Sequence, residues 1–215
     1  DPAFEGFVVL GGAMTAFWLN VLWGMAAQLY WEREVGNLQL FMVAPMSRMA
    51  LLAGMALGGL FTSTVRALST LVLGVLFFRV NMSVADPMAL AAVFALTMLA
   101  VYGMGMMLSS LFLMYGRDAW NISNLLQEPV YLASGFYFPV RELGLASSAL
   151  ASLIPVTLGL DAMRQLLFGG AANGLLPVWV EAAILAVQAV IFFVLARISL
   201  DRMEQRGRRE GRLTL

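Results

Sequence analysis

The sequence predicts an all-α polytopic membrane protein. Of its 215 residues, 61% are hydrophobic and 12% are charged, and the mean hydropathy is +0.84. A soluble domain of this size usually carries about 25% charged residues. Apolar runs of the roughly 20 residues that cross a bilayer recur along the chain. They do not alternate as the strands of a membrane barrel do, and a helix satisfies its own backbone hydrogen bonds in lipid.

Five membrane-spanning helices are predicted within one transmembrane domain that covers residues 1–215. The predicted spans are 6–30, 49–78, 88–113, 120–138 and 178–197. The fourth is shorter and more polar than the others, and Pro129 near its middle favours a kink. Segment 139–177 contains no run long enough to cross, and Pro155 interrupts it. We therefore expect two short re-entrant helices there, packed against protein.

The arginines predict the orientation. All thirteen basic residues are arginine, and nine of them fall on one predicted face, three on the other and one within a span. The positive-inside rule assigns the face with nine to the cytoplasm. Segment 31–48, the turn at 114–119 and the Arg-rich tail 198–215 are then cytoplasmic, and the re-entrant region is extracytoplasmic. The first span would start outside. With a cytoplasmic N-terminus in the natural protein, one further span would lie upstream, and we expect six in the full protein.

Several chemistries are excluded by residues that the sequence lacks. Without lysine the chain has no Walker A motif to bind ATP. Without histidine or cysteine it has no common zinc or haem ligands and no Ser-His or Cys-His nucleophile. The formal net charge of zero gives no electrostatic case for binding nucleic acid. We expect neither a catalytic residue nor a metal or cofactor site in this chain.

Two charged residues near the middle of spans are candidates for the substrate path. Arg66 and Glu128 fall within the second and fourth predicted spans. Charges at this depth are costly and usually face the bundle interior or water. They could pair with each other or across a dimer interface, and Glu128 could contact a cationic substrate. An ion- or proton-coupled carrier that uses both residues is the alternative function.

The re-entrant region contains further candidates for an outer gate. Asp161 and Arg164 are three residues apart, so they share one helix face, where they could form a local ion pair or control substrate release. Phe136 and Tyr137 either line an exit for an amphipathic molecule or anchor the chain at the interface. Pro155 separates the two short helices.

Three motifs follow one another in a specific order along the chain. They are EREVG (32–36) with APMSR (44–48), SGFYFP (134–139), and IPVT (154–157) with DAMR (161–164). In this order they resemble the permease subunits of type-2 ABC exporters, the family that includes daunorubicin-resistance-type drug exporters and polysaccharide exporters. The first motif is similar to the family's cytoplasmic coupling segment, the second to the end of its fifth span, and the third to its re-entrant region.

The resemblance implies a transport subunit that is not itself an enzyme. Two permease copies, identical or related, would pair in the plasma or inner membrane, and the family suggests a prokaryotic source. Two separate ATPase subunits, which bind ATP and Mg²⁺, would dock on the cytoplasmic face. Their closure would press on the coupling segment and export an amphipathic drug-like or lipid-like substrate, or a lipid-linked glycan.

The coupling segment supplies residue types suited to docking. Its candidate residues are Glu32, Arg33, Glu34, Gly36, Pro45 and Arg48. Carboxylates can accept hydrogen bonds from a partner's Arg or Ser, and a guanidinium can form a bidentate pair with a carboxylate. Glycine permits a tight turn, and proline ends the element. A solvated loop with ordinary charges is the other interpretation of the same residues.

Overall fold

The computed structural model describes a helical chain. The described residues are 2–37, 47–78, 80, 84, 86–115, 121, 124, 127–128, 130–169 and 174–209. The α-helices are α1 (Pro2–Leu19), α2 (Ala27–Glu34), α4 (Arg48–Phe78), α5 (Pro87–Tyr115), α7 (Leu145–Ala151), α8 (Pro155–Phe168) and α9 (Val178–Arg209). A π-helix, η1 (Asn20–Ala26), joins α1 to α2, and a 3₁₀ turn, η2 (Val140–Leu143), precedes α7. Among these described residues there is no strand, and the predicted all-α membrane class is confirmed.

Four helices in the described part of the chain are long and apolar enough to cross a membrane. They are Phe4–Glu34, Arg48–Phe78, Pro87–Phe112 and Val178–Arg202. The predicted fourth span, 120–138, is interrupted by residues outside the described set (120, 122–123, 125–126 and 129), and residues 134–138 form turns rather than helix, so a fourth crossing at this place stays a prediction. The last helix continues to Arg209, well beyond the predicted end of the span at residue 197.

Local signals explain where two of the long helices begin. The Ser47 hydroxyl accepts a hydrogen bond from the Ala50 amide at 3.1 Å, which caps the start of α4. At the start of α5, the Asp86 carboxylate accepts from the amides of Met88 and Ala89 at 3.0 Å each. Pro87 follows as the first helical residue, where a missing amide hydrogen is harmless. Both helices therefore start at polar residues just before an apolar run.

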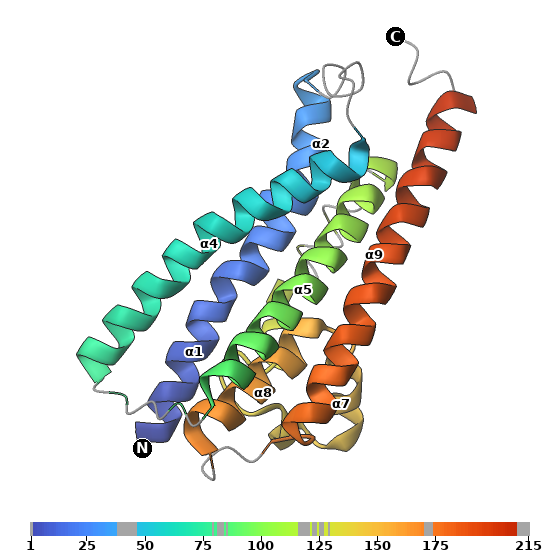
Figure 1. Cartoon of the computed structure of the whole chain (residues 1–215). Helices are drawn as coiled ribbons and strands as arrows, with labels where there is room; N and C mark the ends of the chain where they lie inside the picture. Colours follow the sequence, from blue (N-terminus) through green and yellow to red (C-terminus); the bar gives the residue numbers. More distant parts are fainter. Residues whose placement is uncertain are drawn as a thin grey trace.

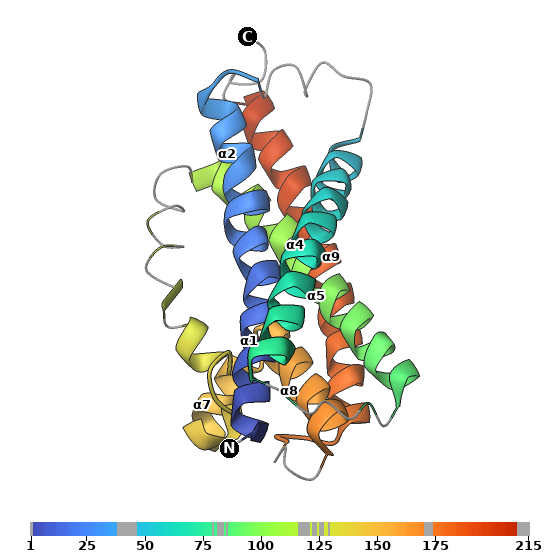
Figure 2. The same cartoon turned by 90° about the vertical axis from the view of Figure 1, so that its left-hand side faces the viewer.

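The long helices lie lengthwise beside one another (Figures 1 and 2). The end of α2, the start of α4 and the ends of α5 and α9 lie at one end of the molecule. The N-terminus, α7 and α8 lie toward the other end. We call these the coupling end and the outer end. The short helices are thus separated from segment 31–37 by the length of the first span.

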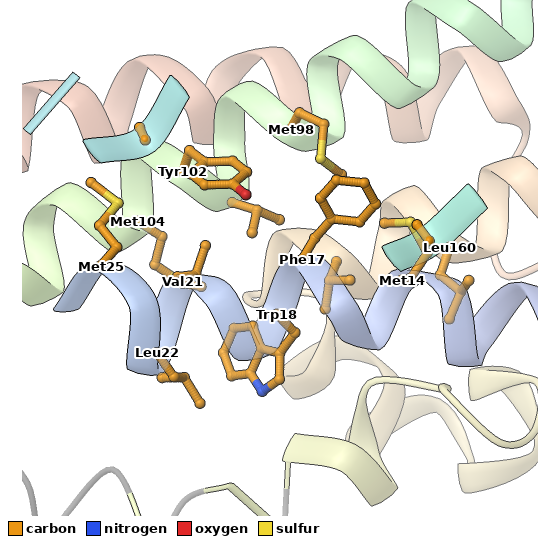
Figure 3. Close-up of a cluster of buried hydrophobic side chains, with 14 of the residues drawn as sticks. Met14, Phe17, Trp18, Val21, Leu22, Met25, Met98, Tyr102, Met104 and Leu160 are labelled. Carbon is orange, nitrogen blue, oxygen red and sulfur yellow. The ribbon is translucent and has the colours of Figure 1, made fainter. Parts of the chain in front are cut away.

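The core forms between the first span, α5 and α8. Figure 3 shows Phe17, Val21 and Met25 of the first span beside Met98 and Tyr102 of α5. In lipid such packing acts mainly through close van der Waals contact. In the most apolar stretch of each span, the share of buried residues is 61% for the first span and 56% for α5. It is 17% for α4 and for α9. The first span and α5 are therefore central, and α4 and α9 are peripheral.

A polar contact lies where the π-helix begins. The Tyr102 hydroxyl donates a hydrogen bond to the Asn20 side-chain oxygen at 3.3 Å. Nearby, the Ser63 hydroxyl donates to the Ala16 carbonyl at 3.3 Å. Gly59 of α4 packs directly against Asn20, where any side chain would overlap it. These contacts join α4, α5 and the first span within the apolar core.

Replacing Gly59 with alanine tests this contact. A Cβ atom at position 59 would clash with Asn20, whereas one at Gly58 meets no atom within 4 Å. We expect Gly59→Ala to be less stable than Gly58→Ala by about 1 kcal/mol, because the end of the Asn20 side chain must move away from the new methyl group and its hydrogen bond from Tyr102 is lost. Both changes remove a helical glycine, so their difference isolates the contact. Thermal unfolding in mild detergent measures it, and equal midpoints would contradict the contact.

Candidate functional site

The coupling end presents an exposed, charged helix terminus. Helix α2 ends at Glu34, and Gly36 follows with a positive φ of 83°, a conformation that favours glycine. The Glu32 carboxylate accepts hydrogen bonds from the side-chain amides of Gln28 at 2.6 Å and Asn37 at 3.0 Å. Arg33, Glu34 and Gly36 are exposed. These residues therefore lie on the surface at the end of the helix, while Glu32 helps to hold the turn.

The rest of the predicted coupling segment is only partly described. Arg48 begins α4 at the same end of the molecule as the α2 terminus, so the structure brings these two parts of the segment together (Figure 1). Pro45 lies outside the described residues, as does most of the APMSR motif. The coupling role of all six residues stays a prediction.

Arg66 and Glu128 do not form a pair within the subunit. Both side chains are exposed, and no ion pair joins them in the described part of the chain. Arg66 lies on the peripheral helix α4. Contact with another subunit or with substrate stays a prediction for these residues, as does a position nearer the membrane surface if the span edges differ from the predicted ones.

The Arg164 guanidinium is buried at the outer end. Its Nη2 atom donates to the carbonyls of Phe7 at 3.0 Å and Phe136 at 3.3 Å, and Nη1 donates to the Phe138 carbonyl at 3.5 Å. The group also lies 5.2 Å from the centre of the Phe7 ring, a cation–π distance. Only 1% of Arg164 is exposed. Burial lowers the pKa of Arg164 to about 10, although the negative charge of Asp161 acts in the opposite direction and raises it. The guanidinium therefore stays charged at neutral pH.

A tight turn presents these carbonyls to Arg164. Gly135 has a φ of 77°, which a residue with a side chain rarely adopts. The carbonyl of the next residue, Phe136, packs against Gly11 of α1 so closely that a Cβ atom there would overlap it. We call Phe7, Gly11, Phe136, Phe138 and Arg164 the outer junction. It links α1, the turn after residue 133 and α8.

The two aromatic residues proposed as an exit face different surroundings. The Phe136 side chain is 1% exposed and packs edge-on against Tyr131, with ring centres 5.4 Å apart. Tyr137 is 51% exposed. Phe136 is therefore placed as a packing residue of the outer junction, and Tyr137 alone of the two is open to a substrate or to lipid.

A buried polar cluster joins α8 to the start of α9. The Asp161 carboxylate accepts from the Leu175 amide at 2.7 Å and from the Gln165 side-chain amide at 3.3 Å. The same Gln165 amide donates to Glu181 at 3.2 Å, and Glu181 accepts from the Leu176 amide at 3.3 Å. Asp161 and Glu181 are 4% and 0% exposed. Asp161 and Arg164 thus have separate hydrogen-bond partners rather than each other.

Sequence reasoning missed Glu181 and Gln165. The signal for Glu181 was present, because it is the acidic residue inside the apolar run 178–197. The run itself does not show which groups Glu181 would bind, because they lie outside it. Pro155, which was predicted to separate two short helices, is the first residue of α8 and is buried, after Ile154 in an extended conformation.

Comparison with known families identifies the chain. The family model of the ABC-2 type transporter matches residues 4–168. The chain belongs to this family. No curated protein and no solved structure matches it. The matched region includes the α2 terminus and the outer junction, and it ends at the last residue of α8. This ABC-2 protein is therefore a membrane permease component with several membrane-crossing helices.

Replacing Glu181 tests the polar cluster. Glu181→Leu keeps the volume but removes the acceptor for the Leu176 amide and Gln165, whereas Glu181→Gln keeps an acceptor oxygen. An unsatisfied buried donor costs about 1–3 kcal/mol. We expect faster amide hydrogen exchange at Leu175 and Leu176 and a lower unfolding temperature for Glu181→Leu than for Glu181→Gln. Identical exchange in both variants would mean that the Glu181 contacts do not hold this loop.

Proposed function

We propose that this ABC-2 protein is the membrane-spanning permease subunit of an ATP-driven exporter. Two ATPase subunits supply ATP hydrolysis, and a second permease copy, identical or related, completes the transporter. The observation that carries the proposal is the family match over residues 4–168, which includes an exposed, charged terminus of the first span. The absence of lysine agrees with ATP chemistry on another chain.

The coupling end has the features that a docking surface for the ATPases needs. Arg33 and Glu34 are exposed, and a carboxylate or guanidinium at that position can form charge-assisted hydrogen bonds with a partner. The Gly36 turn stops the helix, so force applied there acts on the end of the first span. In this proposal the coupling end faces the cytoplasm of a prokaryotic cell, and the chain resides in its inner membrane.

The proposed substrate is an amphipathic drug-like or lipid-like molecule, with a lipid-linked glycan as the other class. Support comes from the outer end of the described structure. The helices α7 and α8 there are short, and the exposed Tyr137 offers an aromatic ring to an amphipathic molecule. Helices α4 and α9 expose apolar faces that suit lipid or a second permease copy. An ion- or proton-coupled carrier that uses Arg66 and Glu128 is the alternative, and transport that persists without any ATPase subunit would favour it.

Reversing the charge of Glu34 tests the docking role. We expect Glu34→Arg to abolish the stimulation of the partner ATPase, because a repelled charge at an interface prevents correct docking. Gly36→Trp should have the same effect, since a side chain is strained at its positive φ of 83°. The measurement is ATP hydrolysis by the ATPase with the permease reconstituted in lipid vesicles.

The matched control is Glu142→Arg. Glu142 is also exposed, but it lies in η2 at the outer end, so the same charge change should leave ATPase stimulation intact. Normal stimulation in both Glu34→Arg and Gly36→Trp would argue against the proposed docking site. A permease that purifies without any ATPase, even from mild detergent, would argue against the exporter itself.

A further inference from the structure

In the outer junction, the buried Arg164 connects α1, the Phe136 turn and α8 through hydrogen bonds to three carbonyls. These contacts offer a route by which movement of the first span can reach the outer end. We propose that the first span acts as a lever, and that Arg164 and Gly11 attach its outer end to the Phe136 turn and to α8. Arg164 is then a positioning residue for transport. This inference rests on the proposed exporter function and adds the path by which a push at the coupling end moves the outer end.

The lever is one continuous helical segment. Helices α1 and α2 are joined through η1 without a break, so Phe7 and Glu34 belong to the same rod. At about 1.5 Å per residue the rod is about 40 Å long between them, enough to connect the two ends of the molecule. Figures 1 and 2 show this segment reaching from the N-terminal end to the coupling end.

The π-helix in the middle of the rod supplies a pivot. Val21, Leu22, Met25 and Ala26 of η1 are buried. Val21 and Met25 lie next to α5, where a Cβ atom added at Gly105 would meet both side chains. π-Helical turns are uncommon, occur often at functional sites and are places where helices bend. The rod is thus held at its middle by packing against α5. A push on its exposed end, at the coupling end of the molecule, would move its opposite end at the outer junction.

The outer end of the rod is attached at two points on one face. Phe7 and Gly11 are one helical turn apart, so they face the same side. Arg164 binds the Phe7 carbonyl and the Phe136 carbonyl with the same nitrogen, Nη2, at 3.0 and 3.3 Å. The Phe136 carbonyl also lies against the Gly11 backbone, with no room for a side chain. The attachment therefore combines a buried hydrogen-bonded cation with direct backbone packing.

Burial makes this attachment resistant to separation. Pulling α1 away would take the Phe7 carbonyl from the guanidinium, which is 1% exposed, and this loss of a hydrogen-bond acceptor by a buried charge is unfavourable. The Nε atom of Arg164 already lacks a partner within the described structure. Motion of α1 is thus expected to move the Phe136 turn and α8 together with it. Gln165 and Asp161 extend the connection from α8 to the start of α9.

A matched pair of glycine variants tests the lever without touching Arg164. In Gly11→Ala the new methyl group overlaps the Phe136 carbonyl, whereas in Gly12→Ala the nearest atom is the Thr70 methyl carbon at 3.6 Å, an ordinary contact. We expect Gly11→Ala to keep ATPase stimulation but to reduce substrate moved per ATP hydrolysed about tenfold, within the range seen for residues that carry coupling. Gly12→Ala should match the wild type.

The absence of cysteine gives a second readout at the outer end. Leu153 precedes α8 and is 67% exposed, so Leu153→Cys can be labelled with a membrane-impermeant maleimide. With the wild-type junction, the labelling rate should change when ATP binds the partner ATPase. The change should be lost in Gly11→Ala and in Arg164→Lys, because lysine keeps the charge but replaces the guanidinium fork, whose Nη1 and Nη2 reach separate carbonyls, with a single ammonium nitrogen.

The outcomes separate the lever from the proposed function. ATP-independent transport by the wild-type complex, or no ATPase stimulation by it, would overturn the exporter function. The lever alone would be overturned by a different result. In that result the wild-type complex couples ATP hydrolysis to transport, and the Gly11→Ala or Arg164→Lys complex does so equally well and keeps the labelling change. If Gly11→Ala does not yield a monodisperse complex, the Arg164→Lys result decides between these outcomes.

Discussion

The outer half of the subunit depends on how the charge of Arg164 is accommodated. A buried cation is tolerated when its donors meet acceptors, and here the acceptors are backbone carbonyls from α1 and from the Phe136 turn. Meeting this requirement brings residues 7, 136, 138 and 164 to one place. It also explains why glycine occupies positions 11 and 135, where the backbones approach closely or turn sharply.

Burial distinguishes two kinds of helix in the molecule. The first span, α5 and α8 surround the buried residues and provide the contacts that determine the shape of the subunit. Helices α4 and α9 pack on them along one side and expose apolar side chains on the other. In water such faces would promote aggregation, but in a bilayer lipid or another subunit covers them without a hydrophobic penalty.

Sequence reasoning identified the chemistry of the outer end better than its contacts. Asp161 and Arg164 were correctly seen as neighbours on one helix, but spacing along a helix does not reveal what lies opposite each side chain. The partners of Arg164 are carbonyl groups, which every residue possesses, so no motif marks them. Glu181 was missed for a similar reason: its partners are an amide of a loop and a glutamine sixteen residues earlier.

The sequence by itself determined the all-α membrane class, the permease resemblance and the approximate order of apolar helices. These follow from composition, from the length of apolar runs and from short motifs, which are local properties of the chain. Only the tertiary structure decided that Phe136 is buried while Tyr137 is exposed, that Arg66 and Glu128 stay apart, and that α1 meets α8 through Arg164. Those facts depend on contacts between residues far apart in the chain, and a local pattern does not encode which distant groups will satisfy a buried charge.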